Sequence, residues 1–166
     1  MGRLSRRAIG LLTSVFVVAA LSAGVAGAAP KAVEAFDTGT WKSLQGSLKQ
    51  PTVVVFTATW CATCPMVMEE LARQIRQRKV PATMVAVVMD VTPGSHDAAL
   101  LKNAHYVRAD RLFAFDGQAA ALRDRVDPNW RGAAPYVVLL SPHAPPRRST
   151  GLPADSELAA WAAAGR

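Results

Sequence analysis

Three apolar runs rich in β-branched residues mark the central part of the chain, and each has the composition of a buried strand. They span residues 52–56, 83–88 and 136–140. After the first run the apolar positions change to helical spacing, at Val67, Leu71 and Ile75. Strands that alternate with helices predict an α/β fold, in which a sheet with parallel members is covered on both faces.

The shorter elements complete this pattern. We expect helices at residues 41–48, 98–104, 119–126 and 158–164, a strand at 112–115, and a last strand near 148–150. Thr92-Pro93-Gly94 predicts a turn, and the proline-rich stretch 142–146 predicts the turn of a hairpin. No repeat, low-complexity tract or composition shift marks a second domain. Residues 29–166 are therefore expected to form one domain with a single core.

The only two cysteines, Cys61 and Cys64, stand between the strand at 52–56 and the helix that follows it. A disulfide between them closes a minimal loop, so it adds little of the stability that a disulfide gains from closing a long one. At the junction of a strand and a helix, unpaired N–H groups and the positive end of the helix dipole stabilise a thiolate. The pair therefore predicts a redox-active dithiol.

The position of each cysteine in the turn predicts its role. Cys61, at the exposed end, is the predicted nucleophile, and Cys64, one helical turn further in, is the predicted resolving thiol that releases a mixed disulfide. Pro65 costs no intrahelical hydrogen bond, because an N–H in the first helical turn has no partner there. Ala62 and Thr63 carry no charged or imidazole group that would stabilise the Cys61 thiolate strongly. This favours a reductant over an oxidant.

Neither a zinc site nor a purely structural disulfide fits the cysteine pair well. A zinc site needs about four ligands, and the remaining candidates, His96, His105 and His143, are scattered with no paired spacing. A purely structural disulfide is disfavoured by the short loop. We therefore expect no metal and no cofactor.

Two segments resemble a known family. Val53 to Pro65, with the approach Phe56-Thr57-Ala58-Thr59-Trp60-Cys61, resembles the active-site segment of the thioredoxin superfamily, most of all that of the TlpA-type thiol:disulfide oxidoreductases of bacterial envelopes. Ala134-Pro135, ahead of the apolar run 136–140, resembles the cis-proline that enters a central strand in that superfamily. The resemblance covers nearly all of the chain after about Val33.

The resemblance implies a thioredoxin-like α/β fold, with a central mixed sheet flanked by helices. The extra strand and helix at 112–115 and 119–126 would then form a TlpA-type insertion before the cis-proline. Pro135 would be cis and lie beside the dithiol, and Ala134 would offer its backbone to a bound substrate, which pairs with it like an added strand. The alternative for Pro135 is a trans proline that merely opens a strand.

The resemblance also singles out residues around the dithiol. Trp60 is expected to shield Cys61 and to contact the partner. Trp130 and Arg131, just upstream of Pro135, either line the same surface or have a structural role. Val55 departs from the family, because related proteins commonly carry a buried carboxylate or an amide at this position, where it can help move the proton of the resolving thiol.

Residues 1–28 have the features of a secretory signal peptide. Arg3, Arg6 and Arg7 make a basic start, residues 9–21 are mostly apolar, and Ala26-Gly27-Ala28 is a small-residue cleavage site. The apolar stretch is shorter than the roughly 20 residues that span a bilayer. We expect cleavage and a periplasmic location. An uncleaved signal that anchors the chain is the alternative, and the export route, general or twin-arginine, stays open.

The formal net charge of +7 comes in part from this predicted signal. A second basic cluster, at Arg73, Arg76, Arg78 and Lys79, falls at the end of the helix after the dithiol, where cations complement the helix dipole. No nucleic-acid-binding motif accompanies it, and export argues against such a partner. The cluster is therefore expected to be a solvated helix end.

Together these features predict a periplasmic thiol:disulfide oxidoreductase whose partners are proteins with dithiols or disulfides. Similarity to the TlpA type suggests a reductant that serves cytochrome c maturation. A reductant outside the cytoplasm needs a membrane electron donor, expected to be of the DsbD or CcdA type.

Two alternatives to this function remain. One is a redox-inert binding module with the same fold. The other is a copper-handling protein similar to Sco, with Met66 and Met68 as soft ligands and His143 as the distal histidine. Against copper, the cysteines of the Sco pattern are spaced by three residues rather than two.

Overall fold

The computed structural model describes residues 28–165, so the predicted signal peptide lies outside the described part except for Ala28. The strands are β1 (Val33–Phe36), β2 (Thr52–Thr57), β3 (Thr83–Val88), β4 (Arg111–Phe115), β5 (Tyr136–Ser141) and β6 (Ala144–Thr150). The helices are α1 (Thr40–Gly46), α2 (Cys64–Gln77), α3 (Asp97–Lys102), α4 (Ala119–Val126) and α5 (Asp155–Ala164), with a 3-10 turn at Tyr106–Arg108. No helix within residues 28–165 has both the length and the apolar character to cross a membrane.

All the strands of the described chain join one mixed sheet in the order β1-β4-β3-β2-β5-β6. The pairs β1/β4, β4/β3 and β3/β2 are parallel, whereas β2/β5 and β5/β6 are antiparallel. Strand β2 lies inside the sheet, and each of its residues is buried. The unbroken β-branched run 52–56 therefore corresponds to a strand that is covered on both faces.

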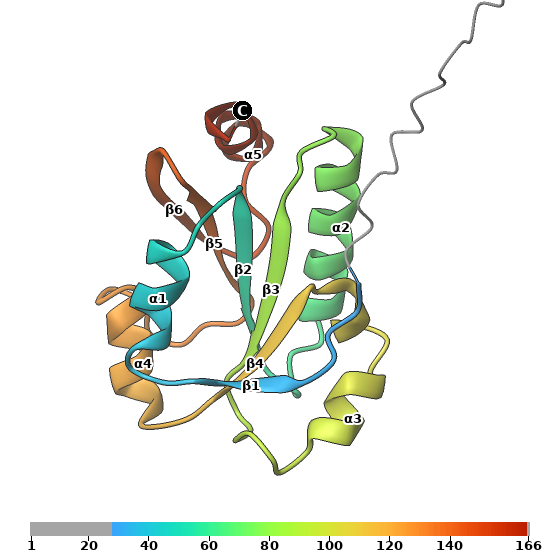
Figure 1. Ribbon diagram of the computed structural model, residues 1–166, viewed down its shortest axis with the longest axis vertical. Coiled ribbons are helices and arrows are strands. Elements are labelled where there is room, and N and C mark those ends of the chain that lie inside the picture. Colours follow the sequence, from blue (N-terminus) through green and yellow to red (C-terminus); the bar gives the residue numbers. More distant parts are fainter. Residues whose placement is uncertain (1–27, 166) are drawn as a thin grey trace, which may run out of the picture.

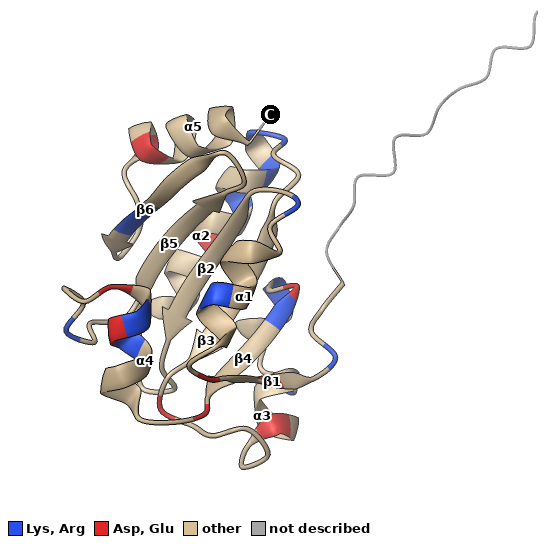
Figure 2. Cartoon of the chain, turned by 60° about the vertical axis from the view of Figure 1, so that its left-hand side comes forward, with Lys and Arg blue, Asp and Glu red and all other residues tan. Residues whose placement is uncertain are grey.

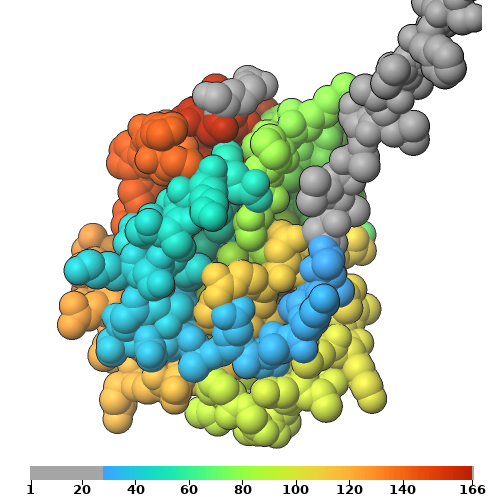
Figure 3. Space-filling model, in the orientation of Figure 1, coloured from blue at the N-terminus to red at the C-terminus, as the bar shows by residue number. Residues whose placement is uncertain are grey.

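The helices cover both faces of this sheet (Figure 1). Because successive side chains of a strand point to opposite faces, Val54 and Phe56 pack in one core with residues of α1 and α4. Val53 and Val55 pack in a second core with residues of α2, α3 and α5. The space-filling view shows the α1 segment, in cyan, lying over the first face beside the yellow atoms of β4 (Figure 3).

The charged residues lie on helices, on strands and in the connecting loops, and the two signs are interspersed (Figure 2). In the basic cluster of α2, Arg73 forms an ion pair with Glu70, and Arg78 forms one with Asp155. Half of the predicted cluster is thus neutralised within the fold, which agrees with a solvated helix end.

Most of the predicted elements are present, and β3 and α4 have the bounds that the sequence predicts. The predicted hairpin is present, but its turn is limited to Pro142 and His143, because β6 begins at Ala144 and includes Pro145 and Pro146. An edge strand tolerates proline, because the N–H groups on its outer side do not pair with another strand. The register of the hairpin shifts between Leu139 and Ser141. Strand β1 was not predicted, because it has four residues and only Phe36 among them is fully buried.

The strand and helix before Pro135 are β4 and α4. Strand β4 lies between β1 and β3, and α4 carries the chain from it to the opposite side of the sheet, where β5 begins. That this insertion is of the TlpA type stays a prediction.

Candidate functional site

The dithiol lies where β2 passes into α2. Strand β2 ends at Thr57, and the chain then turns, with the Cys61 N–H donating to the Ala58 carbonyl at 3.1 Å. Helix α2 begins at Cys64, and Thr63 is its N-cap. Cys61 and Cys64 form a disulfide. Both sulfur atoms therefore lie at the positive end of a 14-residue helix, as the sequence predicts.

The two cysteines are covered to different extents. Cys61 is 7% exposed and Cys64 is 2% exposed, and Ala58 and Ala134 complete the small apolar cluster around them. Beside this cluster the chain exposes two large apolar side chains, Trp60 at 68% and Met66 at 64%. The more accessible cysteine is thus the predicted nucleophile, next to an apolar rim that a partner could cover.

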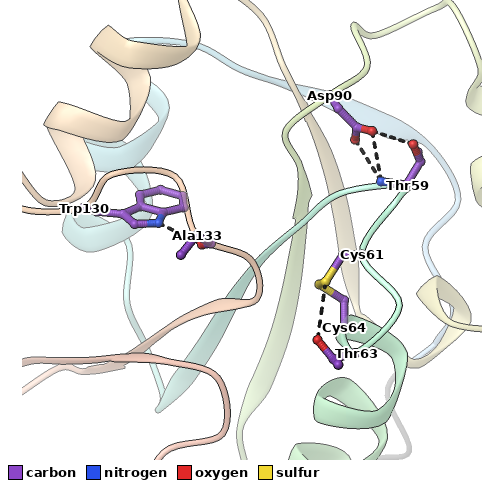
Figure 4. The surroundings of a disulfide bond; sticks show 7 residues. All are labelled: Thr59, Cys61, Thr63, Cys64, Asp90, Trp130 and Ala133. Atoms are coloured by element: carbon purple, nitrogen blue, oxygen red, sulfur yellow. Dashed lines mark hydrogen bonds between the residues drawn. A yellow bond between two sulfur atoms is a disulfide. The ribbon is translucent and has the colours of Figure 1, made fainter.

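Thr63 adds a polar contact that its place in the sequence does not indicate. Its hydroxyl lies 3.8 Å from the Cys61 sulfur (Figure 4). In the reduced protein this hydroxyl can donate to the Cys61 thiolate, because a thiolate is a hydrogen-bond acceptor. The donor is neutral, so Cys61 still lacks a charged neighbour within its own motif.

Asp90 holds the chain segment between β2 and Cys61 in place. Its carboxylate accepts the Thr59 N–H at 2.9 and 3.1 Å and also accepts the Thr59 hydroxyl (Figure 4). Asp90 follows β3, whose carboxyl end lies beside that of its parallel neighbour β2. The sequence offered a signal for this contact, because Asp90 comes just after the run 83–88 and parallel neighbouring strands end at the same edge of a sheet.

The side chains that pack around Val55 are apolar. Val55 is fully buried in the same core cluster as Met68, Ala86 and Val137. Ala86 and Val137 are also its direct partners on the neighbouring strands. The position at which related proteins carry a carboxylate or an amide therefore has no ionisable group here.

Near the end of β2, the buried hydroxyl of Thr57 lies beside Tyr106. Its ring is buried, and burial is the main cause that raises the pKa of its hydroxyl. A hydrogen bond with Thr57 lowers that pKa, and the charge of Asp90 raises it. Tyr106 therefore stays protonated near neutral pH.

The second half of the site is the segment before β5. The Ala134–Pro135 peptide bond is cis, as the resemblance implies. The carbonyls on either side of Ala134 are occupied: Ala133 accepts from the Trp130 indole at 2.9 Å, and Pro135 accepts from the Gly151 N–H at 2.8 Å. Within residues 28–165, neither the N–H nor the carbonyl of Ala134 has a hydrogen-bond partner.

Trp130 and Arg131 occupy different environments. Trp130 is 6% exposed and stacks on the Tyr136 ring, with centroids 4.4 Å apart, whereas Arg131 is exposed. The sequence left open whether Trp130 lines the partner surface or has a structural role, and its burial indicates the structural role. Figure 4 shows its indole N–H directed at the Ala133 carbonyl.

Asp127 connects the two ends of the segment 127–136, which contains Trp130 and Ala134. Its carboxylate accepts the Tyr136 hydroxyl at 2.5 Å and the Asn129 N–H at 2.9 Å. The Tyr136 hydrogen bond is the main cause that lowers the pKa of Asp127, and the Asn129 N–H and the charge of Arg148 act in the same direction. The sequence Asp127-Pro128-Asn129 is a turn signal that could have located this contact.

The structure does not assemble the ligands of the copper alternative. Cys61 follows the end of β2, but His143 follows Leu140, which pairs with Thr52 at the start of β2. The cysteines and His143 thus lie at opposite ends of the sheet. Within residues 28–165, no three His, Cys, Asp or Glu side chains gather as a metal site.

No protein-family model and no curated protein matches this sequence. Among solved structures, a thioredoxin-related protein from Neisseria meningitidis serogroup B is similar, with a TM-score of 0.51 and 20% identity over 71% of this chain and 87% of that one. The chain has the thioredoxin fold.

Two further structures with the thioredoxin fold are similar to this chain. A secreted Mycobacterium tuberculosis disulfide oxidoreductase homologous to E. coli DsbE is 18% identical over 74% of this chain and 85% of that one, with a TM-score of 0.48. A thiol:disulfide interchange protein from Chlorobium tepidum is 15% identical over 75% of this chain and 83% of that one, with a TM-score of 0.48. The predicted α/β class, a mixed sheet flanked by helices, is confirmed.

Replacing Thr63 tests its contact with Cys61. In the reduced protein, Thr63→Val removes the hydroxyl but keeps the shape of the side chain. We expect iodoacetamide to alkylate Cys61 at pH 7 about two- to fivefold more slowly, since one hydrogen bond to the thiolate is lost. Thr63→Ser, which keeps the hydroxyl, is the control. Equal alkylation rates in the Val variant and the wild type would show that the contact does not act on the thiolate.

The lowered pKa of Asp127 predicts an acid-dependent loss of stability. Its carboxylate stabilises the fold above its unfolded pKa of about 3.9, and this contribution is lost as the pH falls through the lower folded value. We expect Asp127→Asn to lower the free energy of unfolding at pH 7 by about 1–2 kcal/mol. In urea unfolding, the difference from wild type should shrink toward pH 3.

The control for this experiment is Asp124→Asn, on the exposed surface of α4, which should match wild type throughout. A difference between Asp127→Asn and wild type that does not change with pH would contradict the assignment.

Proposed function

We propose that this chain is a thiol:disulfide oxidoreductase that exchanges disulfides with protein partners through Cys61 and Cys64. The observation that carries the proposal is the disulfide at the N-terminus of α2, against which Ala134 packs with no hydrogen-bond partner for its backbone N–H or carbonyl among residues 28–165. A structural disulfide does not need a free backbone segment beside it, whereas a dithiol that receives a polypeptide partner does.

The reduction of a partner proceeds in two exchange steps. The Cys61 thiolate attacks one sulfur of the partner disulfide, a Cys61–partner disulfide forms, and the second partner sulfur leaves as a thiolate. Cys64 then loses its proton and attacks the Cys61 sulfur, which releases the first partner sulfur as a thiolate. The partner gains two electrons, and the Cys61–Cys64 disulfide holds the oxidised state.

The Cys64 proton needs an acceptor in the second step. Val55 and its neighbours on β3 and β5 are apolar, so the relay of related proteins has no side chain there. The departing partner thiolate and water are the acceptors that the reaction itself supplies. The second step then needs no ionisable protein group beneath the dithiol.

The partner docks as an extended strand along Ala134. The unpaired N–H and carbonyl of Ala134 supply main-chain hydrogen bonds, and the cysteine of the partner is thereby held over Cys61. Trp60 and Met66 supply apolar contact beside it. Pro135, whose nitrogen carries no hydrogen, ends the segment that is available for pairing.

The direction and the location belong to the same proposal. The chain acts as a reductant, because no charged group of the motif stabilises the Cys61 thiolate. The pattern of residues 1–28 supports export to the periplasm, with residues 29–166 as the working domain. Resemblance to TlpA-type proteins supports a role in cytochrome c maturation, with a membrane donor of the DsbD or CcdA type that returns the two electrons.

The division of labour between the thiols predicts which variant traps partners. In Cys64→Ser, attack by Cys61 is intact but no thiol resolves the mixed disulfide, so covalent partner complexes should accumulate. In Cys61→Ser, the nucleophile is absent and few complexes should form. Non-reducing electrophoresis of cells that express each variant, with and without dithiothreitol, measures the difference.

The double variant Cys61→Ser/Cys64→Ser is the control, and it should trap nothing. Equal trapping by the two single variants would contradict the assigned roles. Absence of complexes in both, together with a wild-type disulfide that dithiothreitol cannot reduce, would favour a redox-inert binding module.

A further inference from the structure

Residues 127–136, which we call the Asp127 loop, are closed at their base by side chains. The Tyr136 hydroxyl donates to the Asp127 carboxylate at 2.5 Å, nine residues apart in sequence. Asp127 also orders the start of the loop. Its carboxylate accepts the backbone N–H of Asn129, and its backbone carbonyl accepts the backbone N–H of Trp130 at 3.0 Å. One carboxylate thus holds both ends of the loop.

The inside of the Asp127 loop is filled by Trp130. Its ring lies nearly parallel to that of Tyr136, with an interplanar angle of 11°, and it also packs on Phe56 of β2 at a centroid distance of 4.9 Å. Its indole N–H donates to the Ala133 carbonyl. Trp130 therefore links the central strand to the residue just before Ala134.

The path of the loop is restricted from α4 as well. Gly132 has a φ of +94°, and a Cβ there would lie 3.3 Å from Nε of Arg123. Only glycine adopts this backbone conformation readily. From β6, the Arg148 guanidinium approaches the Asp127 carboxylate at 3.7 Å. Four elements of the fold, α4, β2, β5 and β6, thus determine the position of a segment that itself has no regular secondary structure.

We propose that Asp127, Tyr136 and Trp130 are positioning residues that hold the Ala134 backbone against the dithiol, ready to pair with an extended polypeptide. This inference rests on the proposed function and adds to it the residues that set the preference for polypeptide partners. The three side chains do not touch the reacting sulfur atoms in any contact of the described chain. They act through the conformation of the segment before Pro135.

The physical reason is preorganisation. A backbone segment that must become ordered when a partner binds loses conformational entropy at that moment, and this loss weakens binding. Here the ordering is complete before the partner arrives, because the Ala133 carbonyl and both ends of the loop are already fixed. A small disulfide without a peptide backbone gains nothing from this arrangement.

Two variants loosen the loop and keep an aromatic side chain at each position. Tyr136→Phe removes the hydroxyl that reaches Asp127 and keeps the stacked ring, and Trp130→Phe removes the indole donor to Ala133. The matched control is Ser141→Ala, which also removes a hydroxyl from β5, but at the far end, where the Ser141 hydroxyl donates to the Ala164 carbonyl at 3.1 Å. Far-ultraviolet circular dichroism and cooperative urea unfolding identify the variants that retain the native fold.

The experiment compares two oxidants of the reduced protein. One is an unstructured peptide that contains a disulfide, and the other is 2-hydroxyethyl disulfide, which has no peptide group. In Tyr136→Phe and Trp130→Phe we expect the second-order rate constant with the peptide to fall roughly five- to tenfold, as for one lost hydrogen bond. The rate constant with hydroxyethyl disulfide should match wild type, and Ser141→Ala should match it with both.

Three results would go against the inference. An unchanged peptide rate in a folded variant would overturn it, and so would an equal fall with both oxidants, because the loop would then act on the dithiol itself. A fall of the same size in Ser141→Ala would show a general loss of stability instead. A wild-type dithiol that reacts with neither disulfide would overturn the proposed function and, with it, this inference.

Discussion

The antiparallel pairing of β2 with β5 is the interaction on which the site depends. Phe56, near the end of β2, lies opposite Tyr136, the first residue of β5. The chain that leaves β2 toward Cys61 and the chain that enters β5 through Ala134 therefore meet at the same end of the sheet. A slip of one residue in this pairing would turn every side chain of the strand to the other face. The burial of β2 on both faces therefore fixes the register of the pairing, and with it the positions of Cys61 and Ala134.

The surroundings of the dithiol are dominated by neutral groups. The helix N-terminus and the Thr63 hydroxyl favour a thiolate on Cys61, and the position of Val55 on β2 is surrounded by apolar side chains. The nearby carboxylate, Asp90, is engaged by Thr59. With only these modest effects on the thiolate, the reduced form gains little extra stability. This is the physical reason for proposing that the chain acts as a reductant.

Features that are local in sequence could be predicted, and features that depend on distant partners could not. The buried strands, the helix after the dithiol and the position of the cysteine pair at the start of that helix follow from composition and spacing over a few residues. The contact between Thr59 and Asp90 joins residues 31 positions apart, and the Asp127 loop needs Tyr136 at its far end. The prolines of β6 misled the prediction, because their place at the edge of the sheet is a tertiary property.

The measurement that tests the central claim most directly is the reduction potential of the Cys61–Cys64 pair. The chain without residues 1–28 is equilibrated with reduced and oxidised dithiothreitol at fixed ratios, and the fraction of free thiols is counted after acid quenching. The account predicts reversible reduction with a potential near that of thioredoxin, about −270 mV. A potential near that of DsbA, about −120 mV, or a disulfide that does not equilibrate at all, would contradict it.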